Sequence, residues 1–171
     1  MKKFLIALVA VAALTGTANA QKFALVDMEY ILKAIPAYES ANEQLNLLST
    51  KWQKEIEIKL TEVQTMYKNY QTELVFLSAE MKKNREDDIL AREKEANDLK
   101  RKYFGAEGEL FQKRESLIKP IQEEIYNAIQ TVSNRENYQM ILDKTSTAGL
   151  IFASPKIDIS ELILSELGYS K

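Results

Sequence analysis

The stretch AYESANEQLNLLSTKWQKEIEIKLTEVQTMYKNYQTELVFLSAEMKKNREDDILAREKEANDLKRKYF (37–104) runs for 68 residues without a glycine or a proline. Because these two residues are the strongest signals for a break in regular structure, their absence predicts a long helical region. A single straight helix of this length would reach about 100 Å, far more than an ordinary globular helix. Apolar residues recur every three or four positions, the period of one helix face, at Leu45, Leu48, Trp52, Ile56, Leu60, Val63, Tyr67, Tyr70, Leu74 and Leu77. The sequence is therefore organised around a coiled-coil-like arm.

The first twenty residues have the pattern of a secretory signal peptide. Lys2 and Lys3 precede an apolar stretch of eleven residues (4–14), and Ala18-Asn19-Ala20 is an A-x-A cleavage site. Eleven apolar residues are too few to span about 30 Å of hydrocarbon. We therefore expect cleavage after Ala20, export to the periplasm, and no membrane-spanning segment in the remaining chain.

The composition argues against several classes of function. Without the two lysines of the predicted signal peptide, 21 basic residues stand against 25 acidic ones, a net charge of −4. Nucleic-acid binding requires a basic surface, so we expect no nucleic-acid partner. The chain has no cysteine and no histidine, so it lacks disulfides, thiolate ligands, and the commonest metal ligand and general base. Its carboxylates lie on predicted exposed helix faces, and we predict no catalytic, cofactor-binding or metal site.

Short apolar runs near both ends of the chain predict strands. They are FALVD (23–27), YQMILD (138–143) and LIFA (150–153), and a polar loop, residues 144–149, joins the last two as a hairpin. An isolated hairpin is marginal in water, and a third strand would support it. If the three runs share one sheet, the helical region between them must leave and return. The sequence therefore predicts an antiparallel helical hairpin.

The ends of the two helical arms are marked by individual residues. Pro36 suits the first turn of the outgoing helix, and Ser78 is an N-cap for the returning one. Gly105 and Gly108 each cost about 1 kcal/mol in a helix and Pro120 about 3 kcal/mol, which predicts a break or kink at both places. The glycines fit a hinge and a local register correction equally well. The return arm carries its own apolar stripe, at Ile89, Ala96, Leu99, Tyr103, Leu110, Leu117, Ile121, Ile125, Ala128 and Val132.

The predicted fold is α+β, with a strand-rich body of residues 21–36 and 137–171 and helical hairpin arms of residues 37–136. A short helix starting near Ser160 and ending at Gly168 completes the body. A core of about 50 residues is usually rescued by disulfides, metal or oligomerisation. Since cysteine is absent and metal ligands are poor, we expect oligomerisation through the body, at Phe23, Leu25, Met140, Ile141, Leu142 and Ile151.

Aromatic and methionine residues interrupt the apolar stripe or lie beside it near its end. A dedicated coiled coil keeps Leu or Ile at both core positions over many heptads, whereas aromatics and methionines suit adaptable contact with many sequences. Two functions follow: holding non-native chains, or binding one folded partner as a structural or adaptor coiled coil of the cell envelope. The candidate contact residues are Trp52, Met66, Tyr67, Tyr70, Phe76 and Met81, and packing within the hairpin is the alternative for each.

The order of these elements carries a resemblance to a known family. FALVDMEYIL (23–32), the long charged excursion, the YFG motif (103–105), LIKPI (117–121) and KIDIS (156–160) are similar to segments of the Skp/OmpH family of periplasmic chaperones. The resemblance covers essentially all of residues 21–171. It implies a homotrimer whose strand-rich bodies join and whose helical hairpins surround a cavity. It also implies that the cavity holds unfolded outer-membrane proteins without nucleotide.

Overall fold

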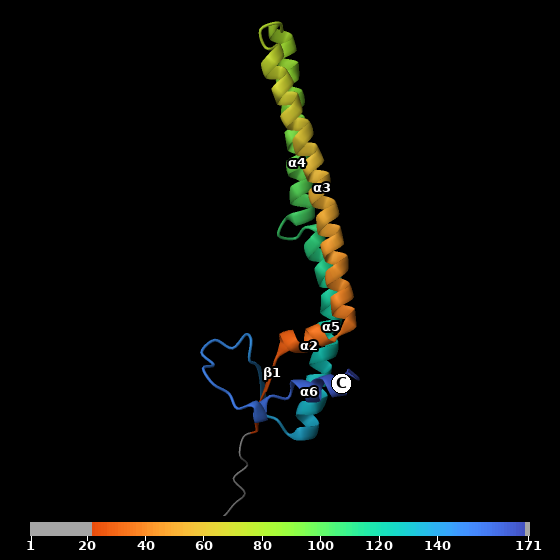
Figure 1. The fold of residues 1–171 in the computed structure, drawn as a ribbon, viewed down its shortest axis with the longest axis vertical. Coiled ribbons are helices and arrows are strands. Elements are labelled where there is room, and N and C mark those ends of the chain that lie inside the picture. Colours follow the sequence, from red (N-terminus) through yellow and green to blue (C-terminus); the bar gives the residue numbers. More distant parts are fainter. Residues whose placement is uncertain (1–21, 170–171) are drawn as a thin grey trace, which may run out of the picture. The chain divides into compact units, whose positions relative to one another are not determined.

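The computed structural model of the chain describes residues 22–169 (Figure 1). The predicted signal peptide, residues 1–20, lies outside the described residues. The described chain is mainly helical, with one pair of short strands, and it divides into two compact units. We call residues 22–31 and 127–169 the strand unit, and residues 32–126 the hairpin unit.

The sheet of the strand unit consists of two parallel strands, β1 (Phe23–Val26) and β2 (Met140–Asp143). Phe23 lies opposite Met140, and Val26 lies opposite Asp143. Parallel strands need a long crossover connection, and here the helical hairpin supplies it. The buried apolar side chains of this unit come from the last three residues of β1, from the helices around it and from Ile159, which directly precedes the last helix. They are Ala24, Leu25, Val26, Ile31, Ala128, Val132, Ile159, Ile163 and Leu164.

The predicted hairpin between residues 138–143 and 150–153 is wrong, because residues 150–153 form no strand. β2 pairs directly with β1. In addition to its partner in β2, Leu25 of β1 forms an isolated parallel bridge with Asp158. The amide of Ile159 donates to the carbonyl oxygen of Leu25 at 2.9 Å. The run 150–153 is therefore left without a strand to pair with, and Ile151 in it is 98 % exposed.

A lysine links three segments of the strand unit. The Lys144 ammonium lies 3.1 Å from the Asp27 carboxylate and 2.8 Å from that of Asp158. Asp158 also accepts a hydrogen bond from the amide of Ser160, at 2.9 Å, where α6 (Ser160–Glu166) begins. Burial raises the pKa of the Asp158 carboxyl, but the hydrogen bonds from Lys144 and Ser160 outweigh burial and hold the pKa below its ordinary value of 3.8. The short 3-10 helix η1 (Pro155–Ile157) ends directly before Asp158.

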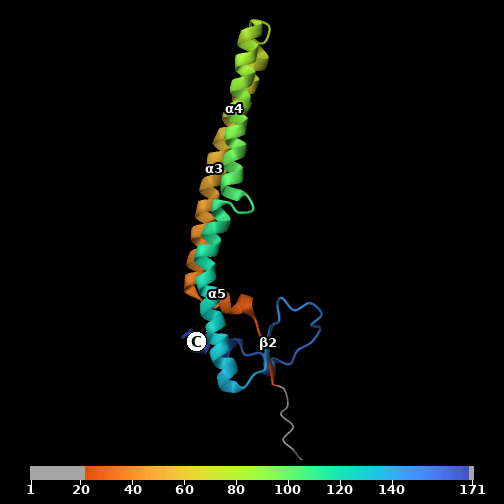
Figure 2. The same cartoon turned by 180° about the vertical axis from the view of Figure 1, so that it is seen from behind.

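The hairpin unit is built on α3 (Pro36–Glu73), which begins at the predicted proline and follows the short helix α2 (Met28–Ala34). Figures 1 and 2 show α4 (Ala79–Phe104) and then the first part of α5 (Glu109–Glu136) running back alongside α3. The return begins at the predicted cap, where the Ser78 hydroxyl accepts a hydrogen bond from the amide of Met81 at 3.2 Å. The antiparallel helical hairpin is confirmed.

Burial follows the predicted stripes with two exceptions. All ten positions predicted on the return arm are buried or half-buried. On α3, however, two residues of the predicted stripe, Leu60 and Tyr67, are 42 % and 55 % exposed, and Tyr67 is also one of the candidate contact residues. Each residue turns a helix by about 100°, which places Leu60 about 80° and Tyr67 about 60° around α3 from the buried Tyr70. Both side chains therefore lie at the edge of the seam.

The return arm is interrupted at the glycines. α4 ends at Phe104 and α5 begins at Glu109, which confirms the predicted break, whereas α5 is not broken at Pro120. Within residues 22–169, no helix combines the length and the apolar character that crossing a membrane requires.

Candidate functional site

An aromatic cluster faces the break in the return arm. The rings of Trp52 and Tyr103 are stacked, with centroids 4.7 Å apart and an interplanar angle of 5°. Phe104 meets Trp52 edge-on at 6.4 Å. The Tyr103 hydroxyl donates to the Glu55 carboxylate at 3.1 Å, and burial together with this hydrogen bond raises the pKa of the hydroxyl. Trp52 is half-buried in this cluster, so only part of its ring is available to a ligand.

The two glycines beside this cluster are required by close backbone packing. A β-carbon on Gly108 would lie 2.9 Å from the carbonyl oxygens of Lys102 and Tyr103, and one on Gly105 would lie 2.4 Å from that of Arg101. These distances are shorter than real β-carbon contacts. The break is therefore a tightly packed turn, and it fits a local register correction better than a loose hinge.

The tip of the hairpin exposes apolar side chains. Val75 and Phe76 are 81 % and 85 % exposed in the turn between α3 and α4, and Met81 in the first turn of α4 is half exposed. Tyr70 is different, because it is nearly buried and its hydroxyl donates to the Glu86 carboxylate. Arg85 forms an ion pair with Glu73 across the turn at 3.5 Å.

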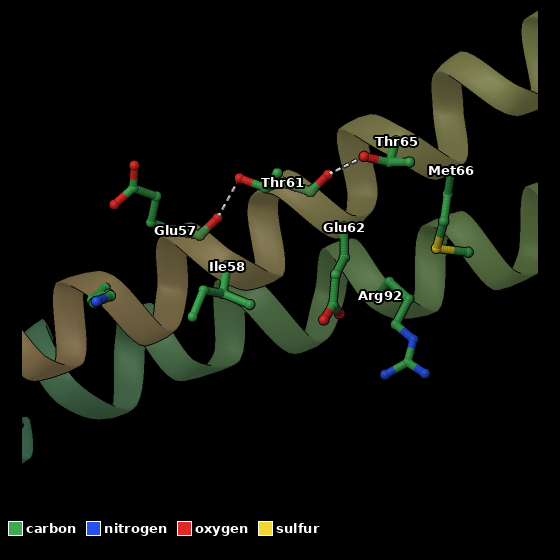
Figure 3. A pocket seen from close by; sticks show the side chains of 8 residues that line it. Glu57, Ile58, Thr61, Glu62, Thr65, Met66 and Arg92 are labelled. Atoms are coloured by element: carbon green, nitrogen blue, oxygen red, sulfur yellow. Dashed lines mark hydrogen bonds between the residues drawn. The ribbon is translucent and has the colours of Figure 1, made fainter.

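An open groove of about 730 Å³ runs along α3 below the tip. Figure 3 shows two rows of side chains on α3 and one side chain from α4. The lining residues are Lys54, Glu57, Ile58, Thr61, Glu62, Thr65, Met66 and Arg92.

The groove offers mainly methyl and methylene groups. The hydroxyl of Thr61 donates to the carbonyl oxygen of Glu57 at 2.8 Å, and that of Thr65 donates to the carbonyl oxygen of Thr61 at 2.9 Å. Because these hydroxyls bond to their own helix, the threonine methyl groups remain for contact, beside Ile58 and Met66. Two charges of the groove are paired within the surface, Glu62 with Lys59 and Arg92 with Glu95.

Comparison with protein families decides the classification. Residues 22–167 match the model of the family described as Outer membrane protein (OmpH-like). The chain belongs to the OmpH-like family. This match covers nearly all of the residues that the structure describes.

A solved structure shares the fold of this OmpH-like chain. It is the crystal structure of a putative outer membrane chaperone (OmpH-like) from Caulobacter crescentus CB15, with a TM-score of 0.67. The match covers 90 % of this chain and 87 % of that chain at 12 % sequence identity. At this identity the likeness establishes the fold. Comparison with curated proteins finds no significant match.

The strand unit of this OmpH-like chain exposes its own apolar surface. Phe23 and Met140, which face each other across the sheet, are 49 % and 50 % exposed. Leu142 and the residues of the loop around Ile151 and Phe152 are also exposed. Among the other residues predicted for oligomerisation, Leu25 is buried and Ile141 is half-buried, so these two contribute to the interior of the unit.

The structure separates the predicted contact residues into three groups. Phe76, Met81 and Tyr67 are exposed, whereas Trp52 and Tyr70 pack within the hairpin. Met66 lines the groove. Ile58 and Val75 are also exposed, but they are not among the predicted contact residues. Both are apolar residues that lie outside the apolar stripe of α3, and this position in the sequence is the signal that could have identified them. In residues 22–169 no group of three or more acidic residues is arranged to hold a metal ion.

Proposed function

We propose that this chain is a periplasmic chaperone that binds unfolded outer-membrane proteins between its helical arms and keeps them from aggregating without ATP. The OmpH-like family and the fold shared with a putative outer membrane chaperone support a chaperone role. The observation that carries the proposal is the set of large apolar side chains left exposed along the hairpin unit, at Ile58, Tyr67, Val75, Phe76, Met81 and Leu90.

These side chains are scattered among charged residues. A non-native chain would therefore make many weak apolar contacts, each contributing about 1 kcal/mol. Several arms acting on one client multiply such contacts through effective concentration, although each contact exchanges quickly. The charged residues between them keep the free arms soluble. No nucleotide is needed, because nothing in this scheme requires an energy-driven release.

Several arms require several copies, and we propose a homotrimer joined through the strand units. A two-stranded sheet leaves strand edges open, and pairing between subunits would cover them. The exposed apolar side chains that such a contact would bury are Phe23, Met140, Leu142, Ile151 and Phe152. The absolute mass in solution tests this assembly, and a stable monomer at low micromolar concentration would contradict it.

Photo-cross-linking tests which surface holds the client. A photoreactive residue is placed at Phe76 or Ile58, with the exposed Glu123 of α5 as the control position. A urea-unfolded β-barrel membrane protein is then diluted into buffer with each variant. We expect strong cross-links from Phe76 and Ile58 and weak ones from Glu123. Equal yields at all three positions would contradict binding by these side chains.

A shortened variant tests whether holding depends on the arms. Joining Glu55 to Arg114 by a short turn removes the tip, the break and the groove but retains the base cluster of Ala41, Leu45 and Ile118. We expect this variant to keep its number of subunits, at the lower mass of the shortened chain, and to lose the client. If a folded partner is captured from envelope proteins and unfolded clients are not, an adaptor function replaces the chaperone function.

A further inference from the structure

Five side chains on α3, centred nearer its start than the groove of Figure 3, form a pattern of charges that the proposed function does not explain, and one of them, Lys54, also lines that groove. Glu39 and Glu43 lie at one end, Leu47 in the middle, and Lys51 and Lys54 at the other end of an open groove of about 830 Å³. Leu47 is 66 % exposed, and it lies about 160° around the helix from the buried Leu45. The groove therefore lies on the side of α3 away from the seam.

The four charged side chains of this groove are exposed. Within residues 22–169, none of them makes an ion pair or a hydrogen bond through its side chain. The two carboxylates are thus separated from the two ammonium groups by a single apolar residue. If a second copy of this surface is turned end to end and placed on the first, the carboxylates of each copy face the ammonium groups of the other. The pattern is therefore complementary to itself.

The side chains are also arranged for helix packing. Glu39, Glu43, Leu47 and Lys51 follow one another at intervals of four residues and form one ridge, and a second ridge ending at Lys54 bounds the other side of the groove. Helices commonly pack by placing such a ridge into a groove of the same kind, with their axes crossing at about −50°.

We propose that this groove is a contact between two copies of this chain, in which α3 packs antiparallel on α3 about a two-fold axis at Leu47. In this arrangement Leu47 meets its own copy, Glu43 faces Lys51, and Glu39 approaches Lys54. Because the contact is two-fold symmetric, each of these charge pairs occurs twice, once on either side of the axis. A parallel arrangement would place like charges together, and an unfolded client of arbitrary sequence would not supply the matching order of charges.

The contact is distinct from the proposed assembly through the strand units, since all of its residues lie in the hairpin unit. Exposed ion pairs stabilise little individually, so a single contact is weak. Particles with several arms, however, offer several such grooves, and multivalent contact strengthens association. The expected result is a reversible association of whole particles at high protein concentration.

A charge exchange tests the proposal with the full-length protein. One variant carries Glu39→Lys and Glu43→Lys, and the other carries Lys51→Glu and Lys54→Glu. Sedimentation equilibrium measures the weight-average mass as a function of concentration. Wild-type protein should at least double its mass on concentration, whereas each variant alone should associate at least tenfold more weakly, because every facing pair then repels.

The mixture of the two variants is the decisive sample. An all-basic groove then faces an all-acidic one, so an equimolar mixture should regain association at or above the wild-type level. Two variants with the same net charge changes elsewhere serve as controls: Glu123→Lys with Glu124→Lys, and Lys68→Glu with Lys94→Glu, all at exposed positions. The controls should associate like wild type, and circular dichroism verifies that every variant keeps its helix content.

Three outcomes would overturn the proposal. The first is a wild-type protein that does not exceed its basal mass at concentrations up to about 1 mM, the range of very weak complexes. The second is a mixture that does not regain the association that each variant has lost. The third is a loss of association in the control variants as full as in the groove variants, which would assign the effect to net charge.

Discussion

The Trp52 indole lies nearly parallel to the phenol ring of Tyr103, with ring centroids 4.7 Å apart. Tyr103 is in the last turn of α4, just before this helix ends with the C-cap residue Gly105. A break in a helix removes backbone hydrogen bonds and would loosen the hairpin at that level. The stacked rings and the hydrogen bond from Tyr103 to Glu55 hold α3 and α4 together there. The break is thus supported by side chains from the opposite helix.

Replacing Trp52 with alanine should destabilise the hairpin unit. Removal of a fully buried tryptophan costs about 3–5 kcal/mol, and since Trp52 is half-buried we expect about 2 kcal/mol. Urea unfolding followed by circular dichroism measures the loss. Trp52→Phe, which keeps an aromatic ring, should lose clearly less than Trp52→Ala. Equal losses for the two variants would show that stacking contributes little.

Gly108 should not tolerate even one added methyl group. In Gly108→Ala the β-carbon would lie 2.8 Å from the amide nitrogen of Gly105 and 2.9 Å from two carbonyl oxygens. Such overpacking costs about 1–3 kcal/mol, more than alanine gains by restricting the unfolded chain. Thermal unfolding measures the change, with Ala106→Ser at an exposed position of the same turn as the control. A Gly108→Ala protein as stable as wild type would refute the packed turn.

Lys144→Met should destabilise the strand unit in a pH-dependent way. The exposed ion pairs to Asp27 and Asp158 contribute up to about 1 kcal/mol at pH 7. The folded-state pKa of Asp158 is lowered, so its contribution is present above the ordinary value of 3.8 and is lost as the pH falls through the folded-state pKa. The stability difference between variant and wild type should therefore shrink as the pH falls below 3.8 and through the folded-state pKa of Asp158.

Denaturant unfolding at several pH values measures this difference, and Lys156→Met, at an exposed lysine, is the control. The control should match wild type throughout. A Lys144→Met defect that persists unchanged in acid would assign the effect to packing by the lysine stem.

The long helices could be predicted because their signals are local. Pro36 fixes the start of α3, the Ser78 hydroxyl caps α4, and Gly105 ends it, each through an effect on its own backbone. The return-arm stripe could be predicted for a similar reason, since one face of a helix repeats with a constant period. These elements can be predicted without any knowledge of the rest of the fold.

The sheet could not be predicted in the same way, because strand pairing joins distant residues. The composition of residues 150–153 suits a strand, but Asp158 pairs with Leu25 in the structure. Composition also does not separate exposed aromatics from packed ones: Phe76 is 85 % exposed, whereas Tyr70 is 9 % exposed beside Glu86. That difference depends on whether the opposite helix offers a partner at the same level.

Light scattering tests most directly whether this chain keeps unfolded outer-membrane proteins soluble without ATP. A urea-unfolded β-barrel membrane protein is diluted into buffer with a stoichiometric amount of the wild-type chain, in the presence and absence of ATP. If the chain is such a chaperone, scattering is suppressed, and to the same extent in both conditions. Scattering as high as without the chain, or suppression only with ATP, would contradict this function.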